Sequence, residues 1–166
     1  MNNSVVRWIK LPGEQDLGFW PLGLVLFLLQ EVPYLVMPLF RPETNPIMNM
    51  TETSAALDGC EKLLGSLCVA LMIFLVHRDA KLFSVSSVRE KRYFALAAAL
   101  LLANFAGWAL YFAGCQSVFV MMLFLVALPT LYYAAIGLWR RNLPLTVCAA
   151  VFFAVHFIHV LRNLTA

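Results

Sequence analysis

Five stretches of the chain are almost entirely apolar, and short polar connections separate them. They cover residues 17–40, 57–76, 93–114, 117–139 and 143–161. A bilayer core about 30 Å thick needs roughly 20 mostly apolar residues per helix, and each stretch meets or approaches that length. None alternates apolar and polar residues as a barrel strand does. The pattern predicts an all-α fold, a polytopic membrane bundle of five transmembrane helices that makes residues 1–166 a single transmembrane domain.

The composition supports a lipid environment. Hydrophobic residues make up 62% of the chain and charged residues 13%, and the mean hydropathy is +0.81, far above that of a soluble domain. The first apolar stretch is too long for a signal peptide, is interrupted by Gln30 and Glu31, and precedes no small-residue cleavage site. We therefore expect it to remain in the mature protein, with the lipid bilayer as the main partner.

The basic residues predict an orientation. Nine of the twelve lie in the N-terminal tail and in the second and fourth connections, namely Arg7, Lys10, Arg78, Lys81, Arg89, Lys91, Arg92, Arg140 and Arg141. The opposite side holds only Arg41 and Arg162, while Lys62 lies just inside the second stretch. Lysine and arginine accumulate on the cytoplasmic side of membrane proteins. We expect the N-terminus inside, the C-terminus outside, and a multi-pass protein of the plasma membrane; nothing suggests nucleic-acid binding.

The connection at residues 41–56 is the one long loop on the predicted outer side. It is rich in Pro, Asn and Thr, which predicts an irregular cap over the bundle. Asn49-Met50-Thr51 and Asn163-Leu164-Thr165 match the glycosylation acceptor pattern and fall on that side.

Small residues predict how the helices pack. Ala99, Ala103 and Gly107 follow one another at four-residue spacing in the third stretch, which favours a close approach, and we expect the second stretch to be its partner. Cys60 and Cys115 would then lie near each other at the outer face, where a disulfide is permitted.

Glu31 is the most informative residue of the sequence. Counted at about 1.5 Å per residue from Phe40, it lies roughly 13 Å below the outer boundary. An ionised carboxylate at such a depth costs about 2.5–3.5 kcal/mol, so it must face the interior, find a partner or be protonated. Asn104 falls at nearly the same depth and shares a helix face with Trp108, and we expect that face to meet Glu31.

Further polar residues descend from the outer surface. Asp58, Glu61 and Lys62 open the second stretch, and His156 and His159 lie near the end of the fifth. Asp58 and Lys62 also suit a simple ion pair at i, i+4. The shared depth predicts a polar pocket in the outer half of the bundle, and the candidate ligand-binding residues are Gln30, Glu31, Tyr34, Glu61, Asn104, Trp108, His156 and His159.

Three functions fit this pattern. The first is binding of a small ligand, a cation or a proton, related to transport, with a homo-oligomer or a larger membrane complex as the working unit. The second is a membrane-embedded enzyme that uses Glu31 or Glu61 together with His156 as acid and base on a lipid or isoprenoid. The third is an accessory subunit whose polar residues only specify helix pairing.

The sequence identifies no catalytic residue and no cofactor. Two histidines at i, i+3 and a carboxylate could ligate zinc, but this spacing alone is a weak signal, and we assign no metal ligands from it.

Overall fold

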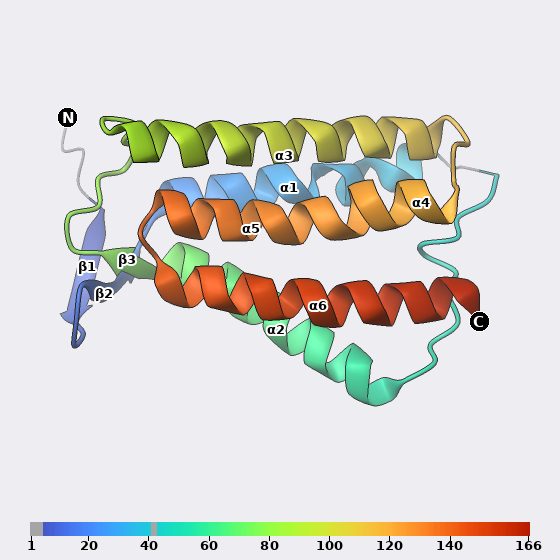
Figure 1. The fold of residues 1–166 in the computed structure, drawn as a ribbon, viewed down its shortest axis with the longest axis horizontal. Coiled ribbons are helices and arrows are strands. Elements are labelled where there is room, and N and C mark those ends of the chain that lie inside the picture. The colour runs from blue at the N-terminus through green and yellow to red at the C-terminus, as the bar shows by residue number, and fades with distance from the viewer. Residues whose placement is uncertain (1–4, 41–42) are drawn as a thin grey trace.

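A computed structural model describes residues 5–40 and 43–166 and is mostly helical, as predicted. The bundle contains α1 (Pro21–Phe40), α2 (Ala55–Phe74), α3 (Val88–Phe112) and α6 (Leu143–Thr165), together with a composite helix. In that helix a single turn, α4 (Val118–Val120), continues into a π-helical segment, η1 (Met121–Ala127), and then into α5 (Leu128–Trp139). Figure 1 shows these helices side by side, with α2 inclined to the others.

A small antiparallel sheet closes one end of the bundle, which the sequence analysis did not predict. Its strands β1 (Val6–Lys10), β2 (Gln15–Phe19) and β3 (Leu75–His77) pair in the order β1-β2-β3. The sheet corrects two predicted helix boundaries. The apolar pattern predicts residues 17–19 and 75–76 as parts of the first and second helices, but they are paired strand residues.

The two ends of the bundle differ in chemistry. We call the end that carries the sheet the sheet end, and the opposite end, with residues 43–54 and the C-terminus, the loop end (Figure 1). The nine basic residues of the predicted inner side lie on the sheet, on the connections or in the first turns of α3, all at the sheet end. Arg140 stacks over Trp20 with its guanidinium 4.4 Å from the ring centre. Burial lowers the pKa of Arg140 to about 10, which still leaves it charged at neutral pH. Arg162 lies at the loop end, and Arg41 falls outside the described residues.

Within the described residues, four helical segments are long and apolar enough to cross a membrane: α1, α3, α6 and the composite helix 118–139. They are compatible with an integral membrane protein. Helix α2 has a suitable length but carries Asp58, Glu61 and Lys62 in its first turns. Five spans, and the orientation of the chain, therefore remain predictions.

The helices pack in a different order from the predicted one. Helix α3 packs mainly against α5 and η1, and α2 packs mainly against α6, so the expected pair of the second and third helices is wrong. Gly107 of α3 has the close contact that small residues permit, but its neighbour is Phe124 of η1. Cys60 and Cys115 are both exposed free thiols, so the disulfide that the sequence permitted is not formed.

The π-helical segment has a cause in the sequence. The Leu128 N–H bonds to the Leu123 carbonyl, five residues back, and the next bond in this register would run from residue 129 to Phe124. Residue 129 is proline, which has no N–H, so the Phe124 carbonyl loses its helical donor. Asn104 replaces that donor, with Nδ2 2.7 Å from the Phe124 oxygen.

Candidate functional site

A cavity of about 330 Å³ lies between α1, α2, α6 and the composite helix, and it contains part of the predicted pocket. Gln30, Glu31, Tyr34 and His156 line it, as the sequence analysis predicted. Its other walls are mostly apolar and aromatic: Phe27, Gly65, Ser66, Val69, Leu125, Pro129, Thr130, Tyr133 and Phe152. We call this cavity the Glu31 pocket.

Glu31 is the half-buried acid of this pocket, and its carboxylate has no hydrogen bond or ion pair to any residue in the described parts of the chain. The predicted contact between Glu31 and Asn104 is wrong. Asn104 instead accepts a bond from Gln30, with 3.1 Å between Gln30 Nε2 and Asn104 Oδ1. Adjacent residues on a helix point about 100° apart, so Gln30 faces α3 while Glu31 faces the pocket.

Trp108 lies outside the Glu31 pocket. It packs edge-to-face on Tyr34, with ring centres 4.7 Å apart, and lines a separate apolar groove between α1 and α3 of about 440 Å³. Its indole N–H has no hydrogen-bond partner among the described residues. Of the eight predicted site residues, Asn104 and Trp108 thus support the wall behind the pocket instead of lining it.

Glu61 joins the two histidines of α6 at the loop end. Its Oε2 accepts a short hydrogen bond from Nδ1 of His159, and its Oε1 lies 3.1 Å from Nδ1 of His156. The second contact has ion-pair distance, but its direction does not make a hydrogen bond, and Nδ1 of His156 has no hydrogen-bond partner within residues 5–40 and 43–166. Of the two carboxylates that the acid–base hypothesis paired with His156, Glu61 makes the contact and Glu31 does not. Glu61 also bonds to His159, and that hydrogen bond holds the Glu61 carboxylate in place.

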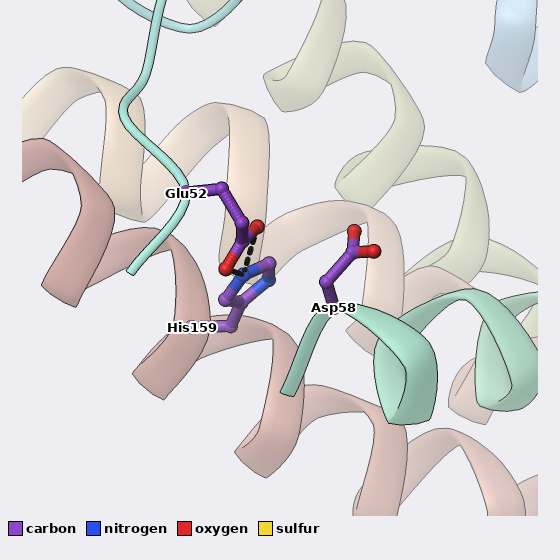
Figure 2. Close-up of side chains that lie close together, drawn as sticks. All are labelled: Glu52, Asp58 and His159. Carbon is purple, nitrogen blue, oxygen red and sulfur yellow. Dashed lines mark hydrogen bonds and ion pairs between the residues drawn. The ribbon is translucent and has the colours of Figure 1, made fainter. Parts of the chain in front are cut away.

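Three residues of this cluster were missing from the predicted site. Glu52, in the loop, lies 2.9 Å from Nε2 of His159 through its Oε2. Asn163 is buried, and its Nδ2 lies 2.9 Å from the same nitrogen. Asp58, at the start of α2, completes a group of metal-ligating side chains with Glu52 and His159, whose ligand atoms lie within 4.8 Å of one another (Figure 2). Asp58 had been recognised as a polar residue at this depth, whereas no pattern in the sequence marked Glu52.

The loop that carries Glu52 is fixed to the bundle by hydrogen bonds near both of its ends. Tyr111 donates a hydrogen bond to Asn45, with 2.6 Å between the oxygens, and Thr53 donates to Asn163 through both its N–H and its hydroxyl. The loop is thus the irregular cap that its composition predicted. Asn163 is engaged in these contacts and only 7% exposed, so it is not available as a glycosylation acceptor in this structure, whereas Asn49 is exposed.

The hydrogen bonds of the Glu52 carboxylate determine its protonation state. The backbone N–H of Ser54 lies 2.6 Å from Glu52 Oε1, and this bond, assisted by His159, lowers the pKa of the Glu52 carboxyl below its usual range. Glu52 is therefore ionised at neutral pH.

The sequence matches no protein-family model, no curated protein and no solved structure. The chemistry of the described residues is consequently the only basis for a functional conclusion.

Proposed function

We propose that this chain is a multi-pass integral membrane protein that binds a small organic cation in the Glu31 pocket, as a step in its transport. The observation that carries the proposal is the Glu31 carboxylate, which faces a cavity of ligand size without a partner among the residues described. Pockets for small molecules typically measure 300–1,000 Å³ and combine apolar walls with a few polar groups.

The walls favour an organic cation over an anion. Phe27, Tyr133 and Phe152 place aromatic rings around the acid. Aromatic faces attract ammonium groups, by roughly 0.5–2 kcal/mol per contact, and a carboxylate adds a full opposite charge. A small amine or quaternary ammonium ion would therefore offset the cost of an ionised carboxylate in this position.

The backbone near Glu31 offers additional acceptors. Pro33 and Pro38 lie within α1 and have no N–H, so the carbonyls of Leu29 and Tyr34 lack their usual helical donors. These two carbonyls flank Glu31 in the sequence. Interrupted helices with free carbonyls are a common feature of substrate and ion sites in transporters, which supports the link to transport.

The test is binding and uptake of a series of small amines and quaternary ammonium ions by purified protein in proteoliposomes. We expect the wild type to bind at least one of these ions, and Glu31→Gln to weaken that binding at least tenfold. Glu43→Gln removes an exposed carboxylate outside the pocket and is the matched control. Equal binding by the Glu31→Gln variant would refute the pocket assignment. Binding that depends on Glu31 without any uptake would refute the transport step alone.

A further inference from the structure

The group formed by Glu52, Asp58 and His159 lies outside the Glu31 pocket and has a different chemistry. Its members come from three segments: the loop, the first turn of α2 and the end of α6 (Figure 2). One imidazole nitrogen and two carboxylates are a common ligand set for divalent transition metals, whereas Ca²⁺ and Mg²⁺ favour oxygen ligands alone. We propose that these three residues bind a divalent transition-metal ion, with Glu61 orienting the imidazole.

The orientation of His159 is the strongest argument for this site. Its Nδ1 is held by the carboxylate of Glu61, which fixes the ring and leaves Nε2 to face Glu52. Histidines that ligate metals usually donate their other N–H to a carboxylate or carbonyl in this way. His159 is 5% exposed and Glu61 is also partly buried, so the imidazole already has this orientation before any ion binds.

The hydrogen bonds around Nε2 are mismatched without a cation. Nε2 meets two carboxylate oxygens of Glu52, at 2.9 and 3.1 Å, and the amide donor of Asn163 at 2.9 Å. If Nε2 is unprotonated, its lone pair faces the carboxylate; if it is protonated, its N–H faces the Asn163 donor. The Asn163 amide cannot turn over without loss, because its Oδ1 already accepts from Thr53. A cation between an unprotonated Nε2 and Glu52 would replace the repulsion between the lone pair and the carboxylate by two attractive contacts.

Charge and distance also fit a divalent ion. Three carboxylates, of Glu52, Asp58 and Glu61, lie around His159. Lys62 is the one ammonium paired with them among the described residues, which leaves a formal excess of two negative charges. Tetrahedral ligand atoms about 2.1 Å from zinc are about 3.4 Å apart. In the present structure the ligand atoms of the three residues lie up to 4.8 Å apart. A rotation of the exposed Glu52 side chain or the half-exposed Asp58 side chain would bring them to the spacing that zinc requires.

Titration of the purified, metal-free protein with Zn²⁺ tests the proposal. Cys60 and Cys115 are exposed and could bind zinc themselves, so the titration uses the Cys60→Ser/Cys115→Ser protein. We expect one ion per chain and a thermal unfolding midpoint that rises with zinc concentration. Co²⁺ should occupy the same site and give visible absorption bands that zinc abolishes. Ca²⁺ at the same concentration should not displace the cobalt.

Variants locate the ion. We expect His159→Gln to weaken zinc binding at least 100-fold, and Glu52→Gln and Glu61→Gln to weaken it about 10- to 100-fold. Glu43→Gln in the same loop and Glu31→Gln in the pocket should bind zinc as the parent protein does. If His159→Gln does not fold, the exposed Glu52 variant still decides the question. The proposal is overturned if the parent protein binds no zinc, if Glu52→Gln and Glu43→Gln bind it equally, or if Ca²⁺ displaces the cobalt.

Discussion

Asn104 connects three helical segments through one side-chain amide. Its oxygen accepts from Gln30 of α1, and its nitrogen donates to the Phe124 carbonyl of η1, while Asn104 itself belongs to α3 and is fully buried. Each bond satisfies a group that would otherwise be unpaired in an apolar interior. Such groups cost about 1–3 kcal/mol each when they lose their partner.

Asn104→Leu should therefore destabilise the protein by roughly 2 kcal/mol or more, because it leaves both Gln30 and the Phe124 carbonyl without a partner. The measurement is denaturant or thermal unfolding in detergent. Ala106→Leu adds a leucine at an exposed position of the same helix and should change the stability by less than about 0.5 kcal/mol. If both variants had the same stability, the amide would have no structural role.

At the scale of single residues, the sequence predicts how deep a side chain lies in the bundle better than it predicts which way the side chain points. Gln30, Glu31 and Asn104 were placed at one level of the bundle because residues on a helix advance by a fixed rise. Which of the two adjacent residues meets Asn104 depends on the rotation of α1 about its axis. Packing against neighbouring helices sets that rotation, and the amino-acid sequence does not reveal it. The cluster around His159 shows the same limit, because Glu52 comes from an irregular loop without periodicity.

At the scale of elements, the π-helical segment links Pro129 to Asn104. The proline removes the N–H that the Phe124 carbonyl would need, and the amide supplies a substitute from α3. A proline inside a helix is expected to distort it, because the ring removes a backbone donor and crowds the preceding turn. The sequence alone does not predict a π-helix here, because the change of register depends on the helix packed beside it.

Pro129→Ala should make the loss of Asn104 less costly, because an N–H at residue 129 can bond to the Phe124 carbonyl. We expect Asn104→Leu to cost about 1 kcal/mol less in the Pro129→Ala background than in the wild type. A double-mutant cycle of unfolding free energies measures this difference. Strict additivity of the two substitutions would show that the proline and the amide act independently.

The N-terminal hairpin depends on Asp16 of β2. This carboxylate is 2% exposed and lies 3.2 Å from Arg78 and 3.8 Å from Arg7, so it joins β1 to the segment after β3. The strands were not predicted because Leu17 and Phe19 merge with the apolar run of α1. Pairing with a strand 58 or more residues away in the sequence overrode that local pattern.

Asp16→Asn should loosen the sheet, because a neutral amide cannot satisfy two arginines. Hydrogen bonds to charged groups contribute about 1.5–3 kcal/mol, and we expect a loss of that size, concentrated in the sheet. Hydrogen exchange of residues 6–19 should accelerate while exchange in α5 is unchanged. Asp79→Asn, an exposed acid at the same end, is the control and should leave both rates as they are.

At the scale of the whole molecule, the asymmetry between the two ends agrees with the charge pattern of the sequence. The nine basic residues lie at the sheet end, and the His159 cluster and the capping loop lie at the loop end. The largest apolar core cluster includes Trp20, Val76 and Trp139, near the sheet end. The open question is whether α2 crosses the bilayer with its three charged residues. Its Lys62–Asp58 pair, at 2.7 Å, and the contact of Glu61 with two histidines reduce the cost of those charges.

The chain's own thiols can decide whether α2 crosses. Cys60 in α2 and Cys115 after α3 are exposed at the loop end, whereas Cys68 and Cys148 are buried. A membrane-impermeant thiol reagent applied to intact cells should label the wild type at Cys60 and Cys115 if the loop end faces outward. Asp79→Cys, introduced after β3 in the Cys60→Ser/Cys115→Ser background, should be labelled only after the cells are permeabilised. Because residue 60 lies near the start of α2 and residue 79 follows its end, labelling of both from outside would mean that α2 does not cross. Labelling of residue 79 alone would mean that the charge bias assigns the two faces in reverse.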